Sequence, residues 1–195
     1  MVLNFKQIYS DSWNVFKKNW WELIVVTLIM AALTFIPLIG NFLQLFMYCL
    51  ILNAILKSAK GEEIKFSDFF QFKEIANTKI ITILIVIALL GLFMQAISDE
   101  QILAGILTLV VLVITVLIFP LFCVMIDKNL SIKETITDSF NLTKGARFDI
   151  IIFLILNFII TVLGVILLFV GIFVAIPIVT IATVFTYIAL KNKAL

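Results

Sequence analysis

The sequence predicts an all-α integral membrane protein with six transmembrane helices. The helices are expected to form three hairpins, each preceded by a short amphipathic helix at the cytoplasmic surface. Three observations indicate this fold class: the composition, six apolar stretches, and the placement of the basic residues. Apolar residues make up 64% of the 195 residues and charged residues only 13%, against roughly a quarter charged in soluble domains. The expected partner of so much apolar surface is the lipid bilayer.

Six stretches approach the roughly 20 apolar residues that a membrane span needs. The last two have no polar side chain between them, and we place their turn near Gly171 because Arg147 and Lys191 are expected on the same side of the membrane. An even number of crossings must then separate those two residues. The expected spans are Trp20–Ile36, Asn41–Leu56, Lys79–Ile97, Ile102–Ile126, Phe148–Val170 and Ile172–Leu190.

The basic residues predict the orientation. All 14 Lys and Arg residues precede the first span, follow the sixth, or lie in the loops after the second and fourth. The three opposite connections hold no basic residue, and their only charges are Asp99 and Glu100. Because Lys and Arg accumulate in cytoplasmic loops, we expect both termini on the cytoplasmic side.

An internal repeat is indicated by two matching segments, Asn4–Lys17 and Ser131–Lys144. Each begins with a helix N-cap residue and has Gln or Glu three residues later, the spacing of a capping box. Gly145 suits the end of the second helix. The shared polar motifs are Asp11, Ser12 and Asn14 in the first copy and Asp138, Ser139 and Asn141 in the second.

A weaker third copy lies at Phe66–Lys73. The chain is therefore expected to be one transmembrane domain, 1–195, built from repeat-like units at about 1–57, 61–127 and 128–195. Internal repeats are common in transporters, but they also occur in membrane proteins without a transport role.

Short motifs in the repeats and in the tail resemble the YciC-like family of bacterial inner-membrane proteins. They are Ile8–Asn19, Phe119–Phe122 with the segment to Gly145, and Gly171–Pro177 with Tyr187. The segment from Phe119 to Gly145 also resembles the membrane domain attached to some bacterial glycerophosphodiester phosphodiesterases. The resemblance implies a six-span protein of the bacterial inner membrane. It implies no catalytic residues, because the phosphodiesterase activity would belong to a separate soluble domain.

Polar residues at the cytoplasmic edge are the candidate functional residues. Glu22 and Asp149 stand at two span entries, where they either anchor the helices at the interface or form a carboxylate pair in a vestibule. The motif residues of the two copies either bind a lipid headgroup or partner loop, or hydrogen-bond between neighbouring helices. Pro120 and Pro177 lie inside spans and are candidate kinks, either static or part of a gate.

Several classes of function are disfavoured. The chain has no His, and Cys49 and Cys123 lie singly in apolar runs, so neither a metal site nor another cofactor is expected. Nucleic acid is an unlikely partner without a dense basic cluster. We expect a non-enzymatic inner-membrane protein that supports envelope or membrane organisation through lipids or other membrane proteins. The alternative is a small transporter or permease subunit, which an open, polar-lined cavity at mid-membrane would favour.

Overall fold

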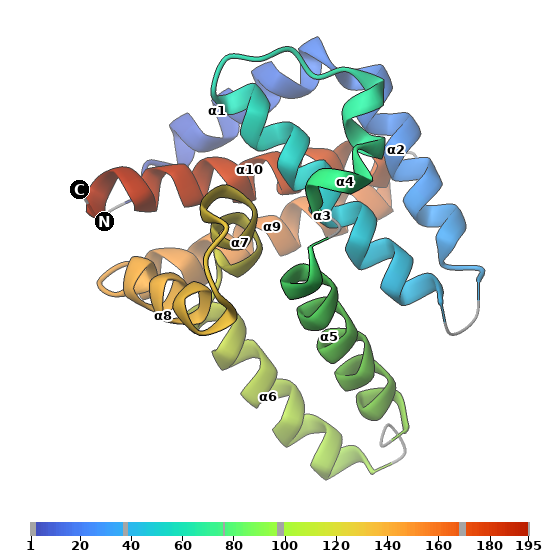
Figure 1. Cartoon of the computed structure of the whole chain (residues 1–195), viewed down its shortest axis with the longest axis vertical. Helices are drawn as coiled ribbons and strands as arrows, with labels where there is room; N and C mark the ends of the chain where they lie inside the picture. The colour runs from blue at the N-terminus through green and yellow to red at the C-terminus, as the bar shows by residue number, and fades with distance from the viewer. Residues whose placement is uncertain (1–2, 37–38, 76, 97–99, 168–170, 195) are drawn as a thin grey trace.

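The computed structural model describes residues 3–36, 39–75, 77–96, 100–167 and 171–194 (Figure 1). Within these ranges the chain forms helices and no strand, so the all-α prediction is confirmed. The elements are α1 (Phe5–Lys18), α2 (Trp20–Leu33), α3 (Gly40–Ala59), the 3₁₀ helix η1 (Phe66–Phe70), α4 (Phe72–Ile75), α5 (Thr78–Ala96), α6 (Gln101–Leu117), α7 (Leu121–Lys128), α8 (Ile132–Thr143), α9 (Arg147–Ile166) and α10 (Ile172–Ala194).

Four helices of the described chain, α3, α5, α9 and α10, are long and apolar enough to cross a membrane. A fifth candidate is the pair α6 and α7, which is bent by 41° at a short break. The helix of the first expected span, α2, has only 14 residues, about 21 Å at 1.5 Å per residue. It ends early because the amide and hydroxyl of Thr34 both donate to the carbonyl of Ala31, which tightens the last turn.

The two candidate prolines differ in their effect. Pro120 is the N-cap of α7, directly after the break that separates α6 from α7. The kink predicted there is therefore a true interruption of the expected span Ile102–Ile126. Pro177 lies inside α10, and the helix continues on both sides of it.

The last two helices are separated at the expected place. α9 ends at Ile166 and α10 begins at Ile172, while residues 168–170, like Asp99, lie outside the described residues. The two helices approach closely at Gly164, where an added Cβ would lie 2.8 Å from the Cβ of Ala175 and 3.0 Å from the carbonyl oxygen of Gly171. Only glycine fits there without a shift of backbone.

The centre of the bundle is formed by the second helix of each expected hairpin, α3, α7 and α10. Apolar side chains from all three are fully or almost fully buried there, and both cysteines belong to this core. α5 and α6 extend away from the rest of the bundle toward the bottom of Figure 1, and both expose large apolar side chains. The core residues of the three central helices include Cys49, Leu50, Leu52, Ile55, Cys123, Val124, Ile181, Val184 and Tyr187.

Three short segments precede the hairpins. α1 and α8 are α-helices with the expected N-caps: Asn4 accepts from the amide of Gln7, and Ser131 forms a reciprocal capping box with Glu134. The segment at the weaker third copy differs, because it forms the 3₁₀ helix η1 and the four-residue α4. α1 packs along α10, η1 and α4 pack on α3, and α8 packs on α7.

Candidate functional site

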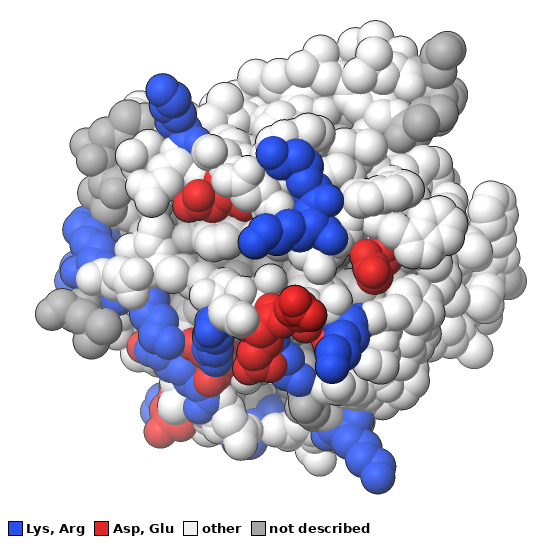
Figure 2. All heavy atoms as spheres, turned by 90° about the horizontal axis from the view of Figure 1, so that it is seen from above, with Lys and Arg blue, Asp and Glu red and all other residues white. Residues whose placement is uncertain are grey.

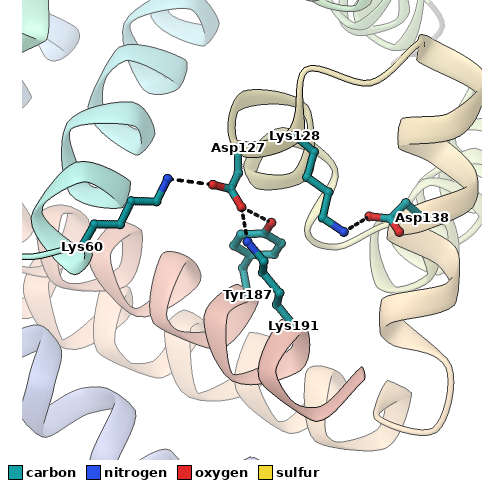
Figure 3. A network of polar contacts seen from close by, with 6 residues as sticks. All are labelled: Lys60, Asp127, Lys128, Asp138, Tyr187 and Lys191. Atoms are coloured by element: carbon teal, nitrogen blue, oxygen red, sulfur yellow. Dashed lines mark hydrogen bonds and ion pairs between the residues drawn. The ribbon is translucent and has the colours of Figure 1, made fainter. Parts of the chain in front are cut away.

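A network of polar side chains joins the ends of the three central helices (Figure 3). The carboxylate of Asp127 accepts hydrogen bonds from Lys60 at 2.9 Å, from Lys191 at 2.6 Å and from the hydroxyl of Tyr187 at 2.8 Å. Lys60 directly follows α3, Asp127 lies in the last turn of α7, and Tyr187 and Lys191 stand one turn apart on α10. One carboxylate therefore connects all three expected hairpins.

The burial of these groups shows which of them depends most on the network. The side chain of Asp127 is 5% exposed, whereas those of Lys60 and Lys191 are 61% and 38% exposed. The lysines can also be solvated by water, but the carboxylate depends on its protein partners to offset its burial. Tyr187 is fully buried, so its hydroxyl likewise needs Asp127 as an acceptor.

A second ion pair extends the network to the motif helix α8. Lys128 is the next residue after Asp127, and its ammonium lies 2.8 Å from the carboxylate of Asp138. Both side chains are 30% exposed, so this pair is worth less than the contacts of Asp127. It fixes α8 to the end of α7.

The first motif helix is attached to a different part of the bundle. Asp149, buried near the start of α9, accepts from the amide of Leu3 at 3.1 Å. The hydroxyl of Tyr9 on α1 donates to Asn157 on α9 at 2.7 Å, and the Tyr9 ring stacks on Phe153. Asn157 thus links α1 to α9 through a hydrogen bond, as amide side chains commonly do between membrane helices.

The eight predicted edge residues do not form one site. Ser12 is buried and donates to the carbonyl of Ile8 within its own helix. Ser139 is also buried, and its hydroxyl has no hydrogen-bond partner among the residues that the structure describes. Asn14 and Asn141 are exposed, and Asp11 and Glu22 are partly buried. Among the described residues, Asp138 contacts the neighbouring helix α7 through Lys128, whereas Asp149 on α9 contacts the distant Leu3.

Asp11 contributes to an open depression of about 260 Å³, but every residue lining it belongs to the first turns of α1 or its N-cap. Among the described residues, no second element lines this depression, so it offers little enclosure to a ligand.

The network around Asp127 was not among the predicted site residues. A signal for it exists in the sequence: each second helix ends with an ionisable residue, and Tyr187 precedes Lys191 by one helical turn. Sequence alone gives no reason to pair Asp127 with Lys60 and Lys191 rather than with nearer bases, because that pairing depends on how the hairpins pack.

The charged surface mixes both signs. In the face shown in Figure 2, acidic and basic side chains lie intermingled, and the described residues at the right edge of the view are uncharged. Within the described residues, no group of three or more Cys, Asp or Glu is arranged to hold a metal ion. The carboxylates of Asp127 and Asp138 form ion pairs between helices.

These features place the chain in the class of helical proteins with several helices capable of spanning a membrane. No protein-family model, curated protein or solved structure matches the chain. The resemblance to the YciC-like family thus continues to rest on its short motifs.

Proposed function

We propose that this protein is a non-enzymatic, six-span protein of the bacterial inner membrane that supports membrane organisation by binding lipids or other membrane proteins. The observation that carries the proposal is the packed centre of the bundle. α3, α7 and α10 meet there through fully buried apolar side chains, including Leu50, Val124 and Ile181. A bundle with such a centre is suited to a scaffold, whose outer surface does the binding.

The Asp127 network supports the same function. It links the ends of the three central helices at one side of the bundle through Lys60 and Lys191. A transporter must separate helices around its substrate during each cycle. Here that separation would break contacts to a carboxylate that is 5% exposed, which is costly.

The contacts of the three entry segments support six spans and a threefold repeat. α1 precedes the first hairpin and packs on α10 of the third; η1 and α4 precede the second and pack on α3 of the first; α8 precedes the third and packs on α7 of the second. Each segment thus packs on the second helix of the previous hairpin in cyclic order. In this arrangement α2 completes a short first span, and α6 with α7 forms one bent span.

The basic residues around Asp127 support the proposed orientation. Lys60, Lys128 and Lys191 end the three central helices and lie in one network with Asp127 and Asp138. The positive-inside rule then assigns this side to the cytoplasm. Leu3 and Leu190 belong to one apolar cluster, so both ends of the chain would lie on that side.

The native cysteines provide the test that separates a scaffold from a transporter. Cys49 lies midway along α3 and is fully buried, and Cys123 is 1% exposed. In membranes, a small water-soluble thiosulfonate reagent should modify neither thiol, whereas Lys193→Cys at the exposed end of α10 should react quickly. Rapid reaction of Cys49 would reveal water at the centre of the bundle and would favour the transporter instead.

The organising role has its own experiment. The tagged full chain is isolated from native membranes, and mass spectrometry identifies the lipids and proteins that remain bound. Reproducible enrichment of particular lipids or membrane proteins over an unrelated six-span protein is expected. Recovery of bulk lipid alone, with no enriched protein, would contradict the proposed function.

A further inference from the structure

An apolar groove of about 280 Å³ lies on the outside of the bundle between α6 and α9. Its volume is slightly below the roughly 300 Å³ at which pockets for whole small molecules begin. Several of its lining side chains are more than half exposed, so the groove opens to the surroundings. It is lined by Leu112, Val116, Ile151, Leu154, Ile155 and Phe158.

α8 lies beside one end of the groove. The hydroxyl of Thr143, the last residue of α8, donates to the carbonyl of Leu117 at 2.8 Å, next to the lining residue Val116. On the other wall, Arg147 begins α9 and precedes the lining residue Ile151 by one helical turn, so the two share a helix face. Arg147 therefore lies one turn beyond the lining residues, near the end of the groove beside α8.

The guanidinium of Arg147 is held there by an aromatic ring, although its Nε has no acceptor. It lies over Phe140 of α8, with its central carbon 4.6 Å from the ring centroid. Among the described residues, none accepts a hydrogen bond from the buried Nε of Arg147. The acid two residues away, Asp149, is engaged by the amide of Leu3. Arg147 as a whole is only partly buried, so an anion from outside can approach the exposed part of this cation.

We propose that this groove binds one acyl chain of an anionic phospholipid whose phosphate contacts Arg147. This inference rests on the proposed placement of α6 and α9 as membrane spans. The groove then opens to the bilayer core, and Arg147 lies at headgroup depth on the cytoplasmic side. A guanidinium binds phosphate oxygens through two parallel hydrogen bonds, which a lysine ammonium cannot do.

The charge of the headgroup decides between lipids. Phosphatidylglycerol brings an uncompensated phosphate, whereas phosphatidylethanolamine carries its own ammonium, which competes with Arg147 for the phosphate. A soluble phosphate ester lacks the chain that fills the apolar groove. The site should therefore prefer phosphatidylglycerol to both.

The test is native mass spectrometry of the purified full chain titrated with phosphatidylglycerol or phosphatidylethanolamine. We expect one phosphatidylglycerol to bind selectively, and Arg147→Gln to weaken its binding about tenfold or more, as for loss of a hydrogen bond to a charged group. Arg147→Lys should retain part of the selectivity. Lys144→Gln, an exposed neighbour in the same loop, is the matched control and should bind like the wild type.

The groove is tested separately from the charge. Leu112→Trp should fill the groove and displace both lipids, because Leu112 lines the groove and is 55% exposed. Leu109→Trp, on an exposed part of α6 outside the groove, should have no effect. Equal binding of the two lipids, full binding by Arg147→Gln, or equally effective competition by glycerol 3-phosphate would each overturn the inference. If one of these results were found while Cys49 stayed unreactive and membrane proteins were enriched in the isolation experiment, the lipid site would be wrong but the proposed scaffold function would still hold.

Discussion

Replacement of Asp127 by Ala should destabilise the bundle more than removal of any other described acid that forms an ion pair. The carboxylate is 5% exposed and accepts hydrogen bonds from Lys60, Lys191 and Tyr187. Its loss removes the link between α3, α7 and α10. Asp138→Ala is the matched control, because Asp138 has one lysine partner and both side chains are 30% exposed.

The expected magnitude follows from the exposure of each partner. The pair with Lys60, whose side chain is 61% exposed, contributes at most about 1 kcal/mol. The buried hydroxyl of Tyr187 would lose its acceptor, at a cost of about 1–3 kcal/mol. The contribution of the partly exposed Lys191 should lie between those of Lys60 and Tyr187. Together, we expect Asp127→Ala to lower the free energy of unfolding by about 2–4 kcal/mol. Asp138→Ala should cost less than about 1 kcal/mol.

The assay is reversible unfolding in mixed micelles, in which added denaturing detergent is titrated and helix content is followed by circular dichroism. Asp127→Ala combined with Lys191→Met should lose less than the two single changes together, because both act on one contact. A loss below about 0.5 kcal/mol for Asp127→Ala, the range of ordinary surface changes, would refute the assignment of Asp127 as the link between the hairpins.

Three further changes test other contacts by the same unfolding assay. Gly164→Ala should cost about 1–3 kcal/mol through overpacking against α10, whereas Gly105→Ala, with nothing within 4 Å of its new Cβ, should be neutral or slightly stabilising; equal effects would contradict the close approach of α9 and α10. Tyr9→Phe should cost about 1 kcal/mol and speed hydrogen exchange in α1, and unchanged exchange would argue against its contact with α9. Ser131→Ala should cost about 1 kcal/mol at neutral pH. Hydrogen bonds from Ser131 lower the pKa of the Glu134 carboxyl below its usual value. The capping box therefore stabilises the fold fully above the unfolded pKa of about 4.3, and this stabilisation is lost as the pH falls through the lower folded pKa. A pH-independent difference in the free energy of unfolding between Ser131→Ala and the wild type would contradict this.

Local signals in the sequence predicted the helices with clear caps and long apolar runs. The N-caps Asn4 and Ser131 and the break near Gly171 lie where their residue types indicated. These features depend on neighbours a few residues away, which a sequence pattern records directly.

The lengths of the helices were harder to predict. Hydropathy continues to Ile36, but α2 ends at Leu33 because Thr34 closes the last turn. The apolar run 102–126 contains two helices, because the segment at Pro120 interrupts it. Apolar composition measures the preference for lipid, whereas helix ends are set by backbone hydrogen bonds.

The candidate site was predicted only in part. Asp138 and Asp149 each contact another segment, but the repeated motifs do not gather at one place. The pairing of Asp127 with Lys60 and Lys191 joins residues that are distant in sequence, so it depends on the packing of all three hairpins. A pattern of single residues cannot specify such a meeting point.

The central claim is that the central helices end together on the cytoplasmic side, where Asp127 joins them. It is tested most directly by single cysteines at Lys17, Lys133, Lys193 and Glu100, all exposed, in a Cys49→Ala, Cys123→Ala background. Each is labelled with a membrane-impermeant maleimide in intact cells and in inverted membrane vesicles. The account predicts that the three lysine positions label only in inverted vesicles and that Glu100→Cys labels only in intact cells. Labelling of Lys133→Cys and Lys193→Cys from opposite sides would contradict it, because Asp127 and Lys191 would then end on different faces of the membrane.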